Sequence, residues 1–327
     1  MQEIKIMTER SYQTWPSWTV VYEWEDVMKS IMQCEIVDLH KGFIGNINRI
    51  TRKINRKLNV IPFSFSWNPN KSIRLIWIMD ARIYREYAYP NCIPIFLDFH
   101  TEMIDEIIKA TQKLPYFWVT SLEIYKKIRE KTDKVQYIPL SISDKWISHE
   151  VPQKDIDVIQ FGRKNLVLHD FMINYCKRHP KTEYVYQTAD STLSYVSTKR
   201  GNLGKFELRS DYMKMVARCK VSLVSSPGID NGKNFGGIDF FTPRFYESAA
   251  QYCHLIGRFT KNEEADYIGI ESVCKLVESE KDFEDEMSKA LQTECEKNLV
   301  AYKDFLTKNC TSVRAKELLG IIRRENA

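Results

Sequence analysis

Short runs of β-branched and aromatic residues alternate along this 327-residue chain with longer segments in which apolar residues recur every three or four positions. This alternation is typical of parallel sheets flanked by helices, so the sequence predicts an α/β fold. Amphipathic helices are expected over 101–112 and 121–131, the second capped by Thr120 or Ser121. In the first half the predicted strands are 3–7, 34–38, 73–79, 93–97, 115–119 and 135–138.

The alternation restarts after 139–154, a polar segment with two prolines and no sustained period. The run 158–161 is apolar, ends at Gly162 and precedes a predicted helix over 165–178, which together make a strand-turn-helix unit. Further strands are expected at 183–187, 220–224, 253–256 and 273–277. Further helices are expected at 209–218, 242–251, 280–307 and 311–325.

The length favours two domains, because one core usually serves roughly 100–200 residues. We place the boundary near Val151, which gives domains 1–150 and 151–327 with a ligand-binding cleft between them. The first ten residues mix charged and apolar side chains, unlike a signal peptide, and no apolar run approaches the roughly 20 residues of a membrane-spanning helix. We therefore expect a cytoplasmic chain.

Charge and motifs argue against several other classes of protein. The net charge of +5 is too small to indicate nucleic-acid binding, and the eight cysteines contain no C-x-x-C pair. The first predicted strand is followed by Thr8-Glu9-Arg10-Ser11 in place of a G-x-G-x-x-G fingerprint, and no P-loop motif occurs. Dinucleotide binding and P-loop chemistry therefore have little support.

The segment 209–259 carries the most informative pattern: a helix, a strand, a Pro227-Gly228 turn, a loop with Gly236-Gly237, and a second helix over 242–251 leading to another strand. This segment resembles the donor-binding domain of group-1 glycosyltransferases, and more closely the subgroup similar to the spore-maturation protein CgeB. The resemblance implies the GT-B architecture of two Rossmann-like domains with closing C-terminal helices. It also implies that 1–150 binds the acceptor and that 151–327 binds a nucleotide sugar.

A nucleotide sugar needs a carboxylate for its ribose hydroxyls and cations or backbone N–H groups for its diphosphate. Arg244 and Glu247 fit these needs, and we include Tyr246 between them. The resemblance implies that Glu247 contacts the ribose. The alternative for Glu247 is a solvated residue near the start of a helix.

Two turns complete the predicted donor site. Gly162 lets the backbone turn closely after the 158–161 strand, and the adjacent Arg163 and Lys164 are cations that suit a diphosphate. The downstream lysine usual in group-1 enzymes is missing. The Pro227-Gly228 turn would help to form a concave anion site, although such turns are also common as simple loops.

Three residues are candidates for catalysis. Group-1 enzymes usually carry E-x7-E, whereas this chain has Asp239 eight positions before Glu247, so the role of Asp239 near the transferred sugar stays open beside a packing role for its loop. Asp98 and His100 follow the 93–97 strand and are candidates for the base that deprotonates the acceptor.

We expect no metal and no cofactor other than the donor substrate. Asp155-Ile156-Asp157 forms a D-x-D sequence, but it precedes the strand at 158–161. Its carboxylates should therefore lie at the edge of the sheet opposite a ligand.

The segment 47–58 is a basic amphipathic helix with isoleucines and Leu58 along one face. It has two interpretations. One is a domain helix with a solvated charged face, and the other is contact with anionic lipid or a lipid-linked diphosphate at the inner face of the cell membrane. Trp15 and Trp18 also have two interpretations: they stack on an acceptor sugar, or they pack in the core.

The sequence thus predicts a metal-independent, hexosyltransferase-like enzyme that moves a sugar from a nucleotide diphosphate sugar to a glycan, lipid-linked or other hydroxyl acceptor in polysaccharide biosynthesis. A non-catalytic nucleotide-sugar or glycan-binding protein with a degenerate GT-B fold is the main alternative. A sugar-nucleotide epimerase is a second alternative.

Overall fold

The structure is a computed structural model that describes residues 3–58, 63, 72–87, 89, 91–189, 193–230 and 238–325. The chain separates into two compact units, Met1–Pro139 with Thr311–Ala327 as unit 1, and Leu140–Cys310 as unit 2. The break thus follows Pro139 and not Val151, and the last helix packs with the first unit. The acceptor and donor roles of the two halves stay predictions.

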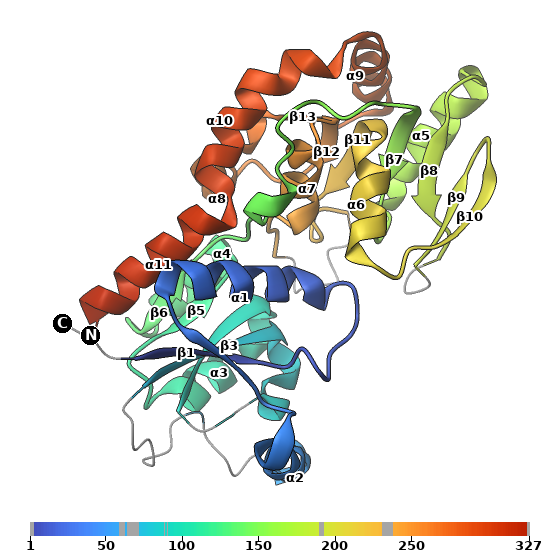
Figure 1. Cartoon of the computed structure of the whole chain (residues 1–327). Helices are drawn as coiled ribbons and strands as arrows, with labels where there is room; N and C mark the ends of the chain where they lie inside the picture. The colour runs from blue at the N-terminus through green and yellow to red at the C-terminus, as the bar shows by residue number, and fades with distance from the viewer. Residues whose placement is uncertain are drawn as a thin grey trace. The chain divides into compact units, whose positions relative to one another are not determined.

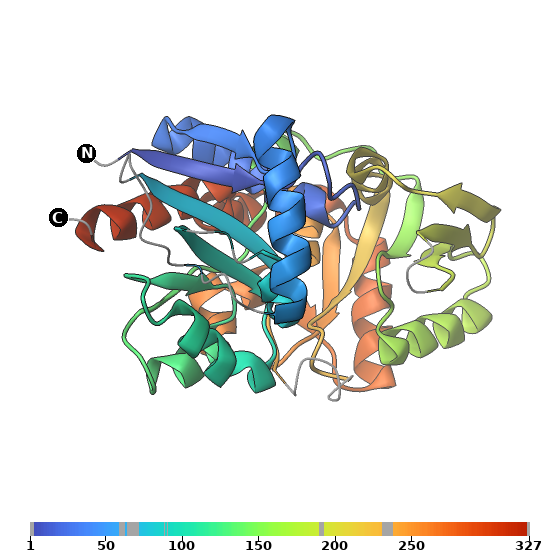
Figure 2. The same ribbon diagram turned by 90° about the horizontal axis from the view of Figure 1, so that it is seen from below.

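The described residues of unit 1 form a six-stranded parallel sheet with the order β2-β1-β3-β4-β5-β6 (Figures 1 and 2). Every strand predicted in the first half is present, with bounds shifted by a few residues. The strands are β1 (Ile4–Thr8), β2 (Glu35–Asp38), β3 (Ile73–Asp80), β4 (Cys92–Asp98), β5 (Phe117–Val119) and β6 (Val135–Tyr137).

The helices of unit 1 include one that the sequence analysis missed, α1, whose Trp24 packs against Trp77 of β3 with 5.1 Å between the ring centroids. Ser121 caps α4, as predicted, by accepting a hydrogen bond from the Ile124 amide. α1 and the C-terminal helix α11 lie side by side (Figure 1). The helices are α1 (Trp18–Met32), α2 (Gly42–Leu58), α3 (Ile104–Thr111), α4 (Leu122–Arg129) and α11 (Thr311–Glu325), with short 3-10 turns η1 (Ala81–Glu86) and η2 (Thr101–Met103).

The described residues of unit 2 form a seven-stranded sheet with the order β10-β9-β8-β7-β11-β12-β13. The antiparallel pair β9 and β10 was not predicted, because β10 is half-exposed, rich in glycine and without an apolar alternation. The strands are β7 (Ile156–Gln160), β8 (Tyr184–Gln187), β9 (Ser194–Ser197), β10 (Gly201–Lys205), β11 (Cys219–Ser225), β12 (His254–Arg258) and β13 (Cys274–Leu276).

Helices cover this sheet from both sides. Alternate residues of β11 face opposite ways: Leu223 packs with α5 and α9, whereas the Ser222 hydroxyl lies 2.7 Å from that of Ser248 in α7. The predicted helix 280–307 is divided, because Thr293 has an extended backbone that ends α9. The helices are η3 (Asp144–Trp146), α5 (Leu166–Arg178), α6 (Arg209–Ala217), α7 (Pro243–Ala250), α8 (Glu263–Ile268), η5 (Ile270–Ser272), α9 (Glu280–Gln292), η6 (Cys295–Asn298) and α10 (Leu299–Asn309).

The segment predicted as a linker, 139–154, belongs to unit 2 from Leu140 onward. Leu140 and Ile142 are buried, and Ile142 forms a parallel bridge with Cys310. Within the described ranges, none of the helices is long and apolar enough to cross a bilayer.

Candidate functional site

The sheet of unit 2 has a topological switch point at β7. The chain proceeds from β7 to β8 on one side and later pairs β11 with β7 on the other side, both in parallel. Open α/β sheets bind ligands at such points, beyond the carboxyl ends of the strands. β7 ends just before Gly162 and β11 ends just before the Pro227-Gly228 turn. The topology therefore brings the two predicted turns to one edge.

The turn after β7 is fixed by side chains from distant parts of unit 2. Gly162 has φ +71, a left-handed conformation that favours glycine, and its amide donates a 3.0 Å hydrogen bond to Tyr195 Oη. Arg244 Nη1 donates a 2.9 Å hydrogen bond to the carbonyl oxygen of Arg163. Arg244, predicted as a diphosphate ligand, thus holds the loop that carries Arg163.

The two cations of this turn differ in their surroundings. The side chain of Arg163 is exposed and forms no ion pair with any residue that the structure describes. Lys164 Nζ donates a 3.2 Å hydrogen bond to the carbonyl oxygen of Thr188 and lies 5.1 Å from the centre of the Tyr186 ring. Arg163 is therefore the more available cation for an anionic ligand.

Glu247 lies in α7 with only 2% of its surface exposed. Its Oε1 atom accepts hydrogen bonds from Arg209 Nη1 and, at 2.7 Å, from Tyr212 Oη. The Tyr212 ring stacks on Phe161 of the β7 loop, with 5.4 Å between centroids. The alternative of a solvated glutamate is therefore wrong, because a buried ion pair holds this carboxylate beside the turn after β7.

Asp239 and Tyr246 have different environments. Asp239 is buried, and its Oδ2 atom accepts a 2.8 Å hydrogen bond from the Thr260 amide just beyond β12. Tyr246 is also buried, and its ring stacks on Phe305 of α10. Asp239 thus lies at the edge that carries the other predicted residues, whereas Tyr246 packs in the core. The ligand roles of both stay predictions.

Gly228 is required by close packing. A Cβ atom at this position would lie 2.8 Å from the carbonyl carbon of Ile238, a separation that real Cβ atoms do not show. The turn after β11 therefore packs directly on the backbone that leads to Asp239. The predicted Gly236-Gly237 loop lies outside the described residues.

Two buried hydroxyls at this edge escaped the sequence analysis. Ser226 follows β11, and Thr242 is the N-cap residue of α7. Neither hydroxyl has a hydrogen-bond partner among the described residues. A buried hydroxyl without a partner is unfavourable, so both are suited to bind a polar ligand. The position of Thr242 before Pro243 was the available sequence signal.

A second missed network lies at the same edge. Asp230 receives two hydrogen bonds from Arg258 at the end of β12, at 2.7 and 2.8 Å, and one from Asn165, which caps α5. Burial alone would raise the pKa of Asp230, but the hydrogen bonds from Arg258 and Asn165 hold the pKa below its ordinary value. The ion pair between Asp230 and Arg258 therefore connects the loop after β11 to the end of β12.

In unit 1, Asp98 is the last residue of β4, and His100 follows two residues later. Asp98 is paired in register with Asp80 of β3, whose carboxylate accepts hydrogen bonds from Arg82. His100 is buried, and burial together with the positive charge of Arg82 lowers the pKa of its imidazole. The structure therefore brings the two predicted base candidates to one edge.

A neighbouring polar network in unit 1 was also missed. Glu9 follows β1 and is buried, and its Oε1 atom accepts a 3.0 Å hydrogen bond from Tyr89 Oη and lies 3.1 Å from His40 Nε2. His40 follows β2, and its ring stacks on Tyr12 at 4.6 Å. Both residues follow the carboxyl ends of strands, the same kind of position for which Asp98 and His100 were selected.

The D-x-D sequence lies at the start of β7, as predicted, and both of its carboxylates have protein partners. Asp155 pairs with Arg218, whose hydrogen bonds lower the pKa of that carboxyl, and Asp157 accepts a 2.7 Å hydrogen bond from the Glu183 amide. Among the described residues, no three His, Cys, Asp or Glu side chains are grouped so that they could hold a metal.

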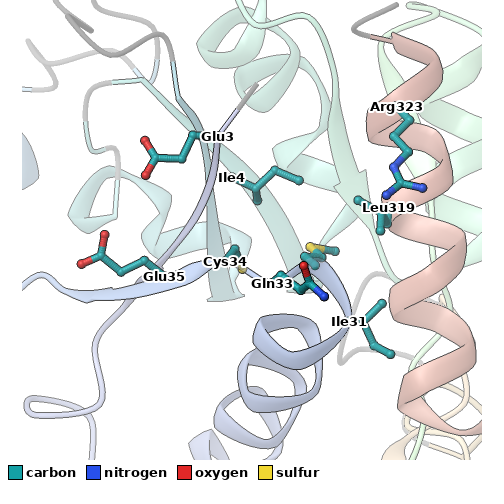
Figure 3. Close-up of a pocket in the computed structure, with 9 residues that line it drawn as sticks. Glu3, Ile4, Ile31, Gln33, Cys34, Glu35, Leu319 and Arg323 are labelled. Atoms are coloured by element: carbon teal, nitrogen blue, oxygen red, sulfur yellow. The ribbon is translucent and has the colours of Figure 1, made fainter. Parts of the chain in front are cut away.

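Figure 3 shows a pocket of about 370 Å³ in unit 1, between the end of α1, the starts of β1 and β2, and α11. Glu3 and Glu35 line it, and both accept from Lys5 Nζ, at 3.3 and 3.0 Å. Arg323 of α11 lines another part of the wall (Figure 3). The pocket thus lies at the amino ends of the strands, opposite the edge that carries Asp98 and His100.

Comparisons with known proteins give similarity in structure alone. No family model and no curated protein matches the sequence. Among solved structures, the chain is similar to AviGT4, a glycosyltransferase involved in avilamycin A biosynthesis, with TM-score 0.60 and 11% identity over 99% of this chain and 98% of that one. It is also similar to T4 phage β-glucosyltransferase in complex with its UDP-glucose substrate, with TM-score 0.52 and 12% identity over 99% of both chains.

A third similar structure is a point mutant of TarM from S. aureus, solved with fondaparinux, α-GlcNAc-glycerol and UDP, with TM-score 0.53 and 12% identity. The match covers 76% of this chain and 55% of TarM, so this chain spans little more than half the length of that protein. At such identities the likeness concerns the fold. The chain has the GT-B fold of two Rossmann-like α/β domains that these glycosyltransferases share.

Proposed function

We propose that the protein is a glycosyltransferase that moves a sugar from a nucleotide diphosphate sugar to a hydroxyl acceptor without a required metal. The observation that carries the proposal is the set of groups at the carboxyl edge of β7 and β11: the Gly162 turn, the exposed Arg163, and Glu247 in its buried pair with Arg209. A fold shared with glycosyltransferases, one of them solved with UDP-glucose, supports it.

In the proposed mechanism, unit 2 binds the donor. Glu247 accepts hydrogen bonds from the ribose, while Arg163, assisted by Lys164 and by backbone amides, stabilises the negative charge that develops on the leaving diphosphate. The Pro227-Gly228 turn and Arg244 shape this site, with Tyr246 behind it, and Asp239 lies toward the transferred sugar. A diphosphate leaving group needs such positive charge whether or not the configuration at the sugar is inverted.

Unit 1 binds the acceptor in this proposal, and Asp98 or His100 takes the proton from its hydroxyl. The lowered pKa of His100 keeps the imidazole neutral near pH 7, which is the form that accepts a proton. We propose a glycan or lipid-linked acceptor, a cytoplasmic site of action and a role in polysaccharide biosynthesis.

The test is calorimetric binding of UDP, GDP, dTDP and NAD, first without metal and then with manganese. We expect one nucleoside diphosphate to bind without metal, and Glu247→Gln to weaken it at least about tenfold. Gln is chosen because it keeps the size of the side chain and a hydrogen-bond acceptor beside Arg209 and Tyr212. The matched control is Asp155→Asn, which changes a carboxylate at the opposite edge of the same sheet and should bind normally.

Two results would contradict the proposal: no nucleotide binds, or Glu247→Gln binds as tightly as the wild type while its melting temperature is unchanged. Binding without any release of nucleoside diphosphate from the matching nucleotide sugar, across a panel of acceptors, would favour the non-catalytic binding protein. Interconversion of the donor sugar without an acceptor would favour an epimerase.

A further inference from the structure

The helix α2 is attached to unit 1 through polar contacts. Asn48 Nδ2 donates a 2.8 Å hydrogen bond to the carbonyl oxygen of Leu39, and Asn55 Nδ2 donates one of the same length to that of Arg85. Arg52 forms an ion pair with Glu86 at 2.7 Å. A domain helix normally buries its apolar face. In α2 the described side chains that bond to the unit, Asn48, Arg52 and Asn55, are instead polar.

Five large apolar residues of α2 lie on the side away from these contacts. They are spaced three or four positions apart, which aligns them in one stripe along the helix. Each is a large side chain with 42% or more of its surface exposed: Phe43, Ile47, Ile50, Ile54 and Leu58. Figure 2 shows α2 along its length with no other helix or strand of unit 1 in front of it. In the described part of the chain, this stripe is the exposed face of the helix.

The charges beside the stripe have one sign. α2 contains no Asp or Glu, and its exposed basic residues on one flank of the stripe are Arg49, Lys53, Arg56 and Lys57. Of these, Arg56 lies 3.9 Å from Glu86. Exposed apolar side chains flanked by cations fit a surface that is apolar inside and anionic outside, which is the interface of a membrane with anionic lipids.

We propose that α2 docks the protein on an anionic membrane surface, with its apolar stripe inserted among the lipid headgroups and its basic flank against their phosphates. The helix lies in the plane of the interface, because its polar side stays bonded to unit 1. This inference does not depend on sugar transfer. A partner protein or a second copy would instead need to offer an acidic rim around an apolar groove.

Co-sedimentation with vesicles tests the proposal, using phosphatidylcholine alone and phosphatidylcholine mixed with phosphatidylglycerol. We expect the wild type to bind the mixed vesicles, more weakly at high salt, and to bind neutral vesicles poorly. Ile47→Ser/Ile50→Ser/Ile54→Ser should weaken binding at least tenfold at any salt concentration. Lys53→Glu/Lys57→Glu should weaken it at least tenfold at low salt.

Matched controls carry the same chemical changes elsewhere. Leu166→Ser/Val300→Ser removes exposed apolar side chains of α5 and α10. Lys297→Glu/Lys303→Glu changes the charge by the same amount as Lys53→Glu/Lys57→Glu, at exposed lysines outside α2. Both control variants should bind the mixed vesicles like the wild type. The proposal is overturned if the wild type does not bind mixed vesicles at low salt, or if the triple serine variant binds as well as the wild type. A dimer would also overturn the proposal under two conditions. Sedimentation velocity would have to show that the wild type is a dimer and the triple serine variant a monomer, and mixed vesicles would have to leave the wild-type dimer intact.

Discussion

Helices α2 and α7 place opposite kinds of side chain in opposite environments. α7 buries Glu247 and Ser248, and both have polar partners in unit 2. α2 leaves Ile50 and Leu58 mostly exposed and turns Asn55 inward. Burying a charge is costly unless it is paired, and exposing apolar surface is costly unless something covers it. Departures from the usual distribution of side chains therefore mark two proposed surfaces, the donor site beside α7 and the membrane surface on α2.

The largest effect should come from breaking the buried pair of α7. Glu247→Ala removes the carboxylate from its buried pair with the Arg209 guanidinium, which should lower the free energy of unfolding by about 3 to 5 kcal/mol. Asp155→Ala breaks a half-exposed pair with Arg218 and should cost about 1 kcal/mol or less. Urea unfolding measures both. Equal losses for the two variants would show that burial of the pair has no special importance.

A buried carboxylate of α1 offers the next test. Burial raises the pKa of Glu25 to about 7, although Thr8 and Arg10 donate hydrogen bonds to it. Because this pKa is raised in the folded state, its contribution to stability is complete below about pH 4.5 and is lost as the pH rises through 7. The loss should amount to about 2 to 3 kcal/mol.

Glu25→Gln should abolish this loss, so the difference in unfolding free energy between the wild type and the variant should change between pH 5 and pH 8. Chemical unfolding at each pH measures it. A constant difference would mean that Glu25 stays ionised in the folded protein, as a fully paired carboxylate would.

The turn that leads toward α7 should tolerate little change. Gly228→Ala places a Cβ atom against the Ile238 carbonyl group and should cost about 1 to 3 kcal/mol and weaken nucleotide binding. Gly320→Ala in α11 is the matched control, because its Cβ would meet only the flexible end of Arg324 at 4.0 Å. Helix propensity predicts that the control gains up to about 1 kcal/mol. Equal thermal melting of the two variants would contradict the close packing at Gly228.

The smallest effect belongs to α2. Ile50→Ser removes an exposed side chain, so the free energy of unfolding should change by no more than about 0.5 kcal/mol. A similar change at a buried site, Ile256→Ser in β12, should cost several times more. If Ile50→Ser destabilised the protein by about 2 kcal/mol or more, the stripe would be part of the core, and the contrast with α7 would disappear.

Most regular elements could be predicted because their signals are local. The strands β3, β4 and β5 contain apolar runs of three or more residues, and the Gly162 turn and the D-x-D sequence were correctly assigned to opposite ends of β7. The elements that were missed lacked such signals: β10 is polar and glycine-rich, and α1 begins at Trp18, in a Trp-Pro-Ser-Trp segment that was considered only for stacking or core packing.

By itself, the sequence determined the α/β class, the strands and helices that periodicity encodes, and the basic and apolar faces of α2. Only the tertiary structure decided the return of 311–327 to unit 1, the pairing of Glu247 with Arg209 and Tyr212, and the outward direction of the stripe on α2. The reason is physical. Periodicity is fixed by neighbouring residues, whereas the face that is buried and the partner of a buried charge depend on segments far apart in the chain.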